Sequence, residues 1–214
     1  MKVVEAYLDA APGKLTAEEQ AAVLHAVPRR RREFATARAC ARSALAQLGM
    51  PPVSIPMGAQ GEPCWPAGAI GSITHCNGYR ACAVALADEY VAIGIDAEPH
   101  APLPAGIEPV IARSEERRRL RALSAQMPEL HWDRLLFSAK ESSYKAWFPR
   151  VKRSLGFEDA SVVLDANRCT FTARPTVGVR ELMGARAELH GRWLVRDGYI
   201  LTAVVQSFRE GQED

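Results

Sequence analysis

Two Asx-Gly dipeptides constrain the fold of this 214-residue chain more than any other feature. Asn77-Gly78 and Asp197-Gly198 each lie between two apolar segments of strand-like composition. Such dipeptides favour the tight turns that join neighbouring antiparallel strands, because both central residues adopt a positive φ. In each half of the chain, segments with helical spacing precede the hairpin. The sequence therefore predicts an α+β fold of two similar lobes in one chain.

The expected elements follow from apolar periodicity and from the positions of proline and glycine. In the first half we expect helices from Thr16 to about Val27 and from Pro28 to about Leu48, and strands at 3–8, 71–75, 79–86 and 90–95. In the second half we expect helices at 107–124 and 130–148, and strands at 159–164, 168–174, 186–195 and 199–206. The proline- and glycine-rich segment 99–106 separates the predicted lobes, 1–100 and 101–214.

Charge and hydropathy exclude several classes of protein. The chain has 27 Lys and Arg against 25 Asp and Glu, so it has no overall field that would attract nucleic acid. No apolar segment approaches the ~20 residues of a membrane span, and the first residues do not resemble a targeting signal. We therefore expect a cytoplasmic protein that binds neither nucleic acid nor membrane.

Two carboxylates follow the apolar segment 91–95. Asp96 and Glu98 are two residues apart and would project from the same face of a strand. Like charges this close repel each other unless a cation lies between them, and carboxylate oxygens are ligands that Mg²⁺ accepts. An isolated pair of this kind is more often simply the solvent-exposed end of a strand.

The predicted helix 130–148 carries a second polar group, Glu141 and Lys145, one turn apart on one face. Taken alone, such a pair only supports the helix. Near Asp96 and Glu98, however, a third carboxylate and a lysine would complete the equipment for phosphoryl transfer. Elsewhere, Thr74 and His75 end a predicted strand. Arg30 and Arg38 lie two turns apart on one helix, where both could reach a phosphate or form a solvated basic face.

Taken together and in this order, these segments resemble the 4′-phosphopantetheinyl transferases of the surfactin- and enterobactin-synthetase-activating type. The pair of motifs G-I-D-x-E and K-E-x-x-Y-K is the most specific part of the resemblance. The matching segments are Arg30–Arg38, Gly61–Pro66, Gly71–His75, Gly94–Pro99, Trp132–Glu141 with Tyr144–Trp147, and Gly156–Asp159. The resemblance implies two similar α+β lobes with coenzyme A held in the cleft between them.

The resemblance also implies a reaction. The 4′-phosphopantetheine arm of coenzyme A is transferred to a serine of an acyl or peptidyl carrier protein, and adenosine 3′,5′-bisphosphate is released. Mg²⁺ or Mn²⁺ is implied as the cofactor, and a monomer as the active form. The implied catalytic roles are proton removal from the carrier serine by Glu141 and stabilisation of the departing phosphate by Lys145. Metal binding is implied for Asp96, Glu98 and Glu141. Phosphate or coenzyme contacts are implied for Arg30, Arg38, Thr74, His75, Asp96, Lys140 and Lys145.

One position departs from the family pattern, and two other functions remain as alternatives. Gln60 stands where close relatives are expected to have a phosphate-contacting lysine, which leaves part of the 3′-phosphate contact to the arginines. A metal-dependent phosphodiesterase or nuclease would use a similar set of carboxylates and lysine. A non-catalytic nucleic-acid-binding module would use the arginines of 29–32 and Arg38, and its affinity would fall steeply with salt.

Overall fold

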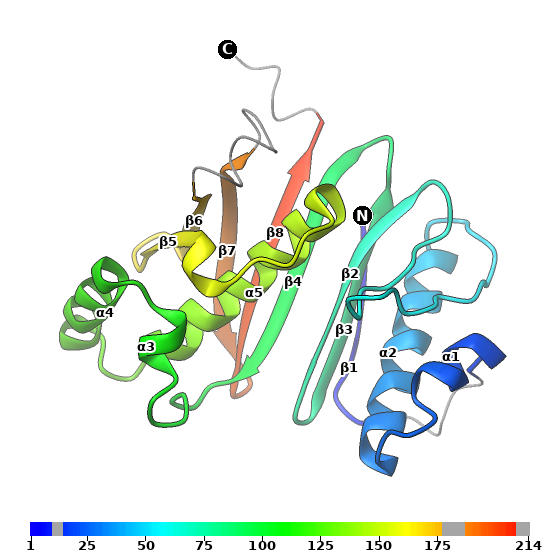
Figure 1. The fold of residues 1–214 in the computed structure, drawn as a ribbon, viewed down its shortest axis with the longest axis horizontal. Coiled ribbons are helices and arrows are strands. Elements are labelled where there is room, and N and C mark those ends of the chain that lie inside the picture. Colours follow the sequence, from blue (N-terminus) through cyan, green and yellow to red (C-terminus); the bar gives the residue numbers. More distant parts are fainter. Residues whose placement is uncertain (10–14, 177–186, 209–214) are drawn as a thin grey trace. The chain divides into compact units, whose positions relative to one another are not determined.

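The computed structural model describes residues 1–9, 15–176 and 187–208. It divides into two compact units. The first contains the described residues of 1–93 together with Ser207 and Phe208, and the second contains those of 94–206. Helices and antiparallel sheets occur in the chain (Figure 1), so the α+β prediction is confirmed.

The first unit contains a three-stranded antiparallel sheet in the order β1-β3-β2. Its strands are β1 (Lys2–Ala6), β2 (Ala69–Cys76) and β3 (Tyr79–Leu86). The predicted Asn77-Gly78 turn joins β2 to β3, with Cys76 opposite Tyr79 and Gly78 at a φ of 78°. The first strand ends at Ala6, two residues earlier than predicted, where its pairing with β3 stops at Arg80.

Helix α2 (Pro28–Ala46) packs against this sheet (Figure 1). Pro28 suits the first helical turn because the N–H that proline lacks has no intrahelical partner there. The apolar residues of the helix meet β3 and the following loop in a buried cluster that includes Ala41, Leu45, Ile55, Cys82 and Val84. The position of α2 is therefore set by burial of one face.

Helix α1 (Ala17–Ala22) is shorter than the predicted segment, which extended to about Val27. The Thr16 cap is present as expected, and its hydroxyl accepts from the Glu19 N–H. The helix ends because Val23 leaves the helical conformation, with its N–H bonded to the carbonyl oxygens of Gln20 and Ala21 in a tighter turn. Pro28 further requires an extended residue before it.

The second sheet has five strands in the order β4-β8-β7-β6-β5. They are β4 (Tyr90–Pro99), β5 (Ala160–Asp165), β6 (Thr170–Pro175), β7 (Leu189–Arg196) and β8 (Tyr199–Ser207). The predicted Asp197-Gly198 turn joins β7 to β8, with both residues at positive φ. Strand β4 continues four residues past the predicted end at Ile95, beside β8. Residue 186, where we expected β7 to begin, lies outside the described residues.

The predicted helix 107–124 is two helices, α3 (Glu108–Ile111) and α4 (Ser114–Gln126). Arg113 between them is extended, with φ −65° and ψ 160°. The buried Glu116 carboxylate accounts for the break, because it accepts the Arg113 N–H at 2.7 Å and the Val162 N–H at 2.7 Å. A continuous helix would engage the Arg113 N–H internally and leave this carboxylate without that donor.

Helix α5 (Trp132–Val151) is the long helix of the second unit, followed by the short 3₁₀ helix η1 (Phe157–Asp159). Its apolar stripe is buried, including Trp132, Leu135, Leu136, Ala139, Ala146 and Trp147. The helix lies over the five-stranded sheet (Figure 1) and packs against β5, β6 and β7. It extends one turn beyond the predicted end, through Pro149, and stops at Lys152 in the left-handed region.

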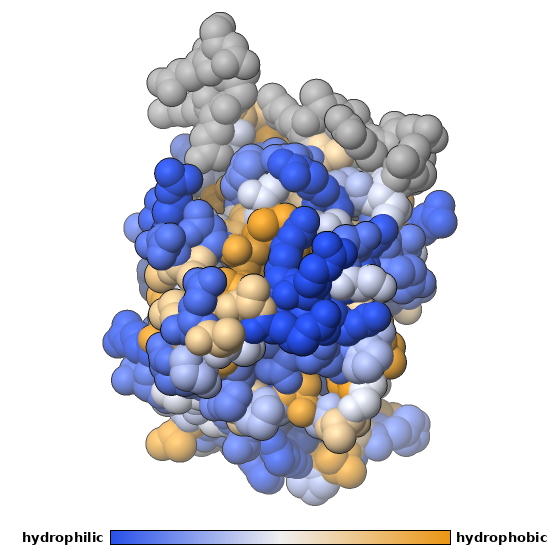
Figure 2. All heavy atoms as spheres, turned by 90° about the vertical axis from the view of Figure 1, so that its left-hand side faces the viewer, coloured by the Kyte–Doolittle hydropathy of each residue, from blue (hydrophilic) through white to orange (hydrophobic). Residues whose placement is uncertain are grey.

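The face of the second unit that carries α4 is mostly polar. Helix α4 lies on the side turned to the viewer in Figure 2, where hydrophilic residues predominate over scattered apolar ones. Exposed residues of α4 include Arg118, Arg119 and Arg121. None of the helices in the described part of the chain combines the length and apolar character that a membrane span requires.

Candidate active site

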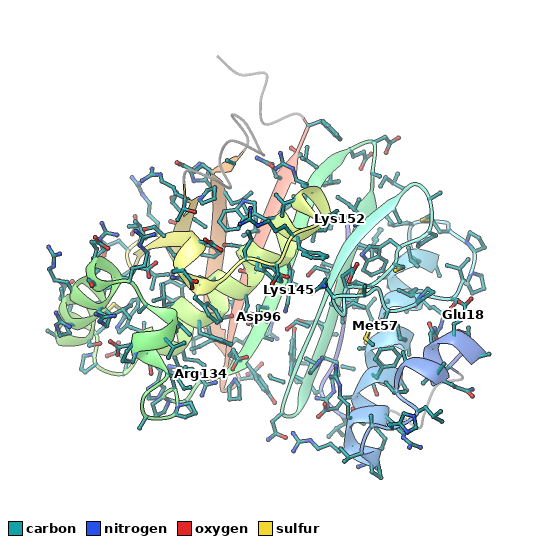
Figure 3. The ribbon with its side chains drawn as sticks, in the orientation of Figure 1. Glu18, Met57, Asp96, Arg134, Lys145 and Lys152 are labelled. Atoms are coloured by element: carbon teal, nitrogen blue, oxygen red, sulfur yellow. The ribbon has the colours of Figure 1, made fainter. Side chains whose placement is uncertain are left out.

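Asp96 is the central carboxylate of the second unit. It lies on β4 and is 6% exposed. Its Oδ1 accepts from the Lys145 ammonium at 2.7 Å, and its Oδ2 accepts from the Ser138 hydroxyl at 2.9 Å. Figure 3 labels Asp96 of β4 and Lys145 of α5. The structure therefore brings together two predicted site residues that are 49 positions apart.

The Ser138 hydroxyl links the Asp96 carboxylate to Thr202 of the neighbouring strand β8. Thr202 of β8 is buried, and its hydroxyl donates to the Ser138 carbonyl oxygen at 2.9 Å. The two hydroxyl oxygens also lie 2.9 Å apart. Because buried polar groups are expensive to leave unpaired, these bonds hold the orientation of Asp96. Neither Ser138 nor Thr202 carries a signal in the sequence, because their roles depend on contacts between distant segments.

Glu98 is paired with an arginine of α5. Arg134 donates to Glu98 Oε2 at 2.8 Å, and also to the carbonyl oxygens of Ala101 and Pro102 at 3.1 and 2.8 Å. Burial raises the pKa of Glu98, with a further increase from the negative charge of Asp96, while Arg134 opposes both. Arg134, labelled in Figure 3, thus fixes the loop after β4 and the orientation of Glu98 together.

Glu141 is the predicted base. Burial raises the pKa of its carboxyl; Lys145 opposes this, and the charges of Asp96 and Glu98 add to it. A raised carboxyl pKa improves the group as a proton acceptor near neutral pH. Asp96 and Glu98 thus act electrostatically on the Glu141 carboxyl, and the grouping of the three as metal ligands stays a prediction.

The three carboxylates fit a hard divalent cation by their donor chemistry, because Mg²⁺ prefers carboxylate oxygens. A cation would also offset the charges of Asp96 and Glu98, which add to the rise that burial causes in the pKa of Glu141. As arranged, Asp96 and Glu98 are neutralised by Lys145 and Arg134. Within residues 1–9, 15–176 and 187–208, no three His, Cys, Asp or Glu side chains are gathered around a single metal position. The metal site stays a prediction.

A pocket of about 230 Å³ opens beside Glu141. Most of its walls are apolar or aromatic, from the second half of α5 and the segment that follows it. The lining residues include Lys140, Glu141, Tyr144, Trp147, Leu155 and Phe157. Trp147 is held by a bond from its indole N–H to the Ala187 carbonyl oxygen at 2.9 Å. The pocket thus places an apolar surface next to the carboxyl of Glu141, the predicted base.

Lys140 has partners other than the predicted phosphate. Its ammonium lies within hydrogen-bond distance of Glu116 Oε2 and of the Ile111 and Phe157 carbonyl oxygens, each at 2.8 Å, and of the Ala160 carbonyl oxygen at 3.2 Å. The side chain is 3% exposed. Burial lowers the pKa of Lys140, and Glu116 opposes that shift. An ammonium has three protons, so the protein itself provides a full set of acceptors.

The predicted phosphate contacts of the first unit fall into two environments. Arg30 and His75 lie together, with the Arg30 guanidinium donating to the His75 ring, and both side chains are exposed or half-exposed. Arg29 next to them donates to the Asn77 side chain at 3.0 Å. This end of α2 and β2 therefore presents positive charge beside an imidazole, as an anion-binding surface requires.

Arg38 and Thr74 are buried instead. Arg38 is 4% exposed; it donates to the Ile55 carbonyl oxygen at 2.8 Å and stacks over Phe34 at 4.3 Å. Burial lowers the pKa of Arg38 to about 10. Thr74 is 3% exposed and, by strand alternation, projects from the face of β2 opposite to His75. The phosphate-binding roles of Arg30, Arg38, Thr74 and His75 stay predictions.

Comparison with protein families identifies two matches that together cover most of the chain. Residues 18–85 match the family described as 4′-phosphopantetheinyl transferase N-terminal domain. Residues 92–203 match the 4′-phosphopantetheinyl transferase superfamily. The second match contains Asp96, Glu98, Glu141 and Lys145, and the first contains the basic residues of α2.

Curated relatives carry consistent names. The chain is 48% identical over 192 residues to the 4′-phosphopantetheinyl transferase Svp of Streptomyces mobaraensis, covering 87% of this chain and 76% of the relative. It is 46% identical over 198 residues to the 4′-phosphopantetheinyl transferase PptT of Mycobacterium tuberculosis, covering 88% and 84%. It is 32% identical over 177 residues to enterobactin synthase component D of Salmonella typhi, covering 82% and 72%.

Proposed function

The chain belongs to the 4′-phosphopantetheinyl transferase superfamily, and we propose that it transfers the 4′-phosphopantetheine arm of coenzyme A to a serine of acyl or peptidyl carrier proteins. The observation that carries this proposal is the cluster of Asp96, Glu141 and Lys145 beside an apolar pocket. The lysine suits the pyrophosphate directly and the acidic groups suit it through a divalent cation, while the pocket suits the neutral arm bonded to the reacting phosphorus.

In the proposed reaction the carrier serine oxygen bonds to the phosphorus that bears the pantetheine arm. The bond from that phosphorus to the oxygen of the adenosine-bearing phosphate breaks, and adenosine 3′,5′-bisphosphate leaves. Glu141 accepts the serine proton, a role that its raised pKa supports. Lys145 stabilises the negative charge on the leaving phosphate oxygen. Its ammonium bonds to Asp96 Oδ1 at 2.7 Å and so lies beside a carboxylate proposed to face the pyrophosphate.

We propose that Asp96, Glu98 and Glu141 hold Mg²⁺ against the pyrophosphate, where the ion would spread the charge that develops as the phosphorus–oxygen bond breaks. Ser138 and Arg134 act through these carboxylates. Ser138 keeps Asp96 turned toward Lys145, and Arg134 keeps Glu98 against the loop after β4. Both are positioning residues.

The test is transfer itself. The protein is incubated with coenzyme A, Mg²⁺ and a panel of apo carrier proteins from fatty-acid, polyketide and nonribosomal-peptide synthesis, and each carrier is followed by intact mass. We expect the mass of at least one carrier to increase by one phosphopantetheine, and this increase to be lost with chelator. The Glu141→Gln variant should transfer the arm far more slowly, whereas the exposed control variant Glu129→Gln should transfer it at the wild-type rate. No mass increase on any carrier, by protein that binds coenzyme A, would refute the proposal.

A further inference from the structure

Lys140 and Glu116 form a buried ion pair immediately beside the proposed base. The ammonium and carboxylate are 2.8 Å apart, with side chains 3% and 1% exposed. Burial of a charge is tolerated only when its partners compensate for the lost water. Here both oxygens of the Glu116 carboxylate are hydrogen-bonded, since Glu116 also accepts the N–H groups of Arg113 and Val162, each at 2.7 Å.

The same ammonium ties together segments that are far apart in the sequence. It reaches the Ile111 carbonyl at the end of α3, the Phe157 carbonyl in η1 and the Ala160 carbonyl at the start of β5. The rings of Phe157 and Phe137 add a contact with centroids 5.6 Å apart. The position of the segment 157–160 relative to α5 therefore depends on this pair.

That segment is a wall of the pocket beside Glu141. Gly156, Phe157 and Ala160 line one side, and Glu141, Tyr144 and Trp147 of α5 line the other. If the lysine is replaced, three carbonyl oxygens lose their donor and the wall is free to move away from α5. A bound phosphate would have to compete with Glu116 and these carbonyls for a side chain that is almost fully enclosed.

We propose that the Lys140–Glu116 pair is a positioning device that holds the wall 156–160 against α5 and so sets the affinity for the pantetheine arm of coenzyme A. This inference rests on the proposed function. Lys140 then contributes through the shape of the pocket and not by contact with a phosphate. Coenzyme A and adenosine 3′,5′-bisphosphate, which lacks the arm, are the two ligands that separate these roles.

The variants are Lys140→Met, Glu116→Gln and the exposed control Lys152→Met. Calorimetric titration measures the affinity of each for both ligands. We expect each of the first two variants to bind coenzyme A at least tenfold more weakly and the bisphosphate within twofold of wild type, with no change in the control. The double variant should be no worse than either single variant, because both remove the same contact.

A phosphate contact predicts the opposite pattern. Lys140→Met would then weaken bisphosphate binding, while Glu116→Gln, which frees the ammonium, would leave coenzyme A binding unchanged or stronger. That result would overturn the inference. Failure of wild type to bind coenzyme A would overturn the proposed function as well, whereas wild-type transfer with the phosphate-contact pattern would overturn the positioning role alone.

A measurement on the wild type covers the case in which a variant does not fold. Amide hydrogen exchange is followed at residues 156–162 with coenzyme A and with the bisphosphate. We expect coenzyme A to slow exchange in this segment by at least tenfold relative to the bisphosphate, because only the arm contacts the wall. Equal protection by both ligands would contradict the proposal.

Discussion

Replacing Gly94 with alanine tests whether close packing of β4 on α5 forms the candidate active site. Built on the existing backbone, the new Cβ would lie 2.8 Å from the Ala146 nitrogen and 3.0 Å from the Ala146 Cβ, and closer still to the Ser142 carbonyl oxygen. Two of these atoms belong to the helix backbone, so rotation of a side chain cannot relieve the overlap. Carbon contacts are optimal at about 3.5–4.0 Å, and α5 must therefore move by roughly 1 Å.

The expected magnitude follows from this overlap. Overpacking costs about 1–3 kcal/mol, and the backbone contact places Gly94→Ala near 3 kcal/mol. For a chain of this size, about 3 kcal/mol lowers Tm by roughly 6–12 °C. The same displacement separates Lys145 from Asp96, which are 2.7 Å apart. Because a misplacement of about 1 Å can reduce a rate by roughly 10², the folded variant should lose transfer activity by that order.

The assay compares Gly94→Ala with Gly191→Ala at a temperature at which both are folded. Gly191 is in β7, and a Cβ there would overlap the ring of Phe171, away from the carboxylate cluster. We expect both variants to lose stability. Only Gly94→Ala should also lose activity per folded molecule, because only this change displaces Lys145 from Asp96. Equal activity of the two variants per folded molecule would refute the reasoning.

Three further predictions concern the polar side chains of the site. Lys145→Gln should lower kcat for transfer by about 10²–10³ at saturating coenzyme A, and a change confined to KM would contradict its role at the leaving group. Arg134→Ala should lower the free energy of unfolding in urea by about 1–3 kcal/mol, whereas the exposed Arg192→Ala should not, because Arg134 donates to the partly buried Glu98 carboxylate and Ala101 carbonyl oxygen. Burial raises the pKa of Glu141, so its stabilising contribution is present below its unfolded pKa and lost as the pH rises through the folded pKa. Without added metal, Glu141→Gln should therefore raise Tm more at pH 7 than at pH 4. An equal rise in Tm at the two pH values would contradict a raised pKa of Glu141.

The elements with local signals were predicted correctly. The Asn77-Gly78 and Asp197-Gly198 turns depend on dipeptides that tolerate positive φ, and the structure has both hairpins. Helix α5 depends on an apolar stripe that can be read from its spacing. These features require no knowledge of what packs against them.

The break between α3 and α4 could not be predicted from local spacing. It depends on the Glu116 carboxylate, which accepts N–H groups from Arg113 and from Val162, 46 residues away. Glutamate is a good helix former, so a continuous helix fits the sequence equally well. The pairing of a buried charge with a distant strand decides between the two.

The candidate site could likewise be predicted only in part, because some of its contacts join distant segments. Asp96, Glu98, Glu141 and Lys145 belong to recognisable motifs, and the structure brings the Asp96 and Lys145 side chains together. Ser138 and Arg134, which hold these carboxylates, lie in the same motif region but carry no signal of their own. The family resemblance implies a phosphate contact for Lys140, whereas its burial can only be seen in three dimensions.

The most direct test of the account is the initial rate of phosphopantetheine transfer by Glu141→Gln relative to wild type, measured by intact carrier mass at saturating coenzyme A and Mg²⁺. The account predicts that wild type modifies the carrier and that the variant is slower by at least about 10², as expected for loss of a general base. Transfer by Glu141→Gln at the wild-type rate would contradict the assignment of Glu141 as the base.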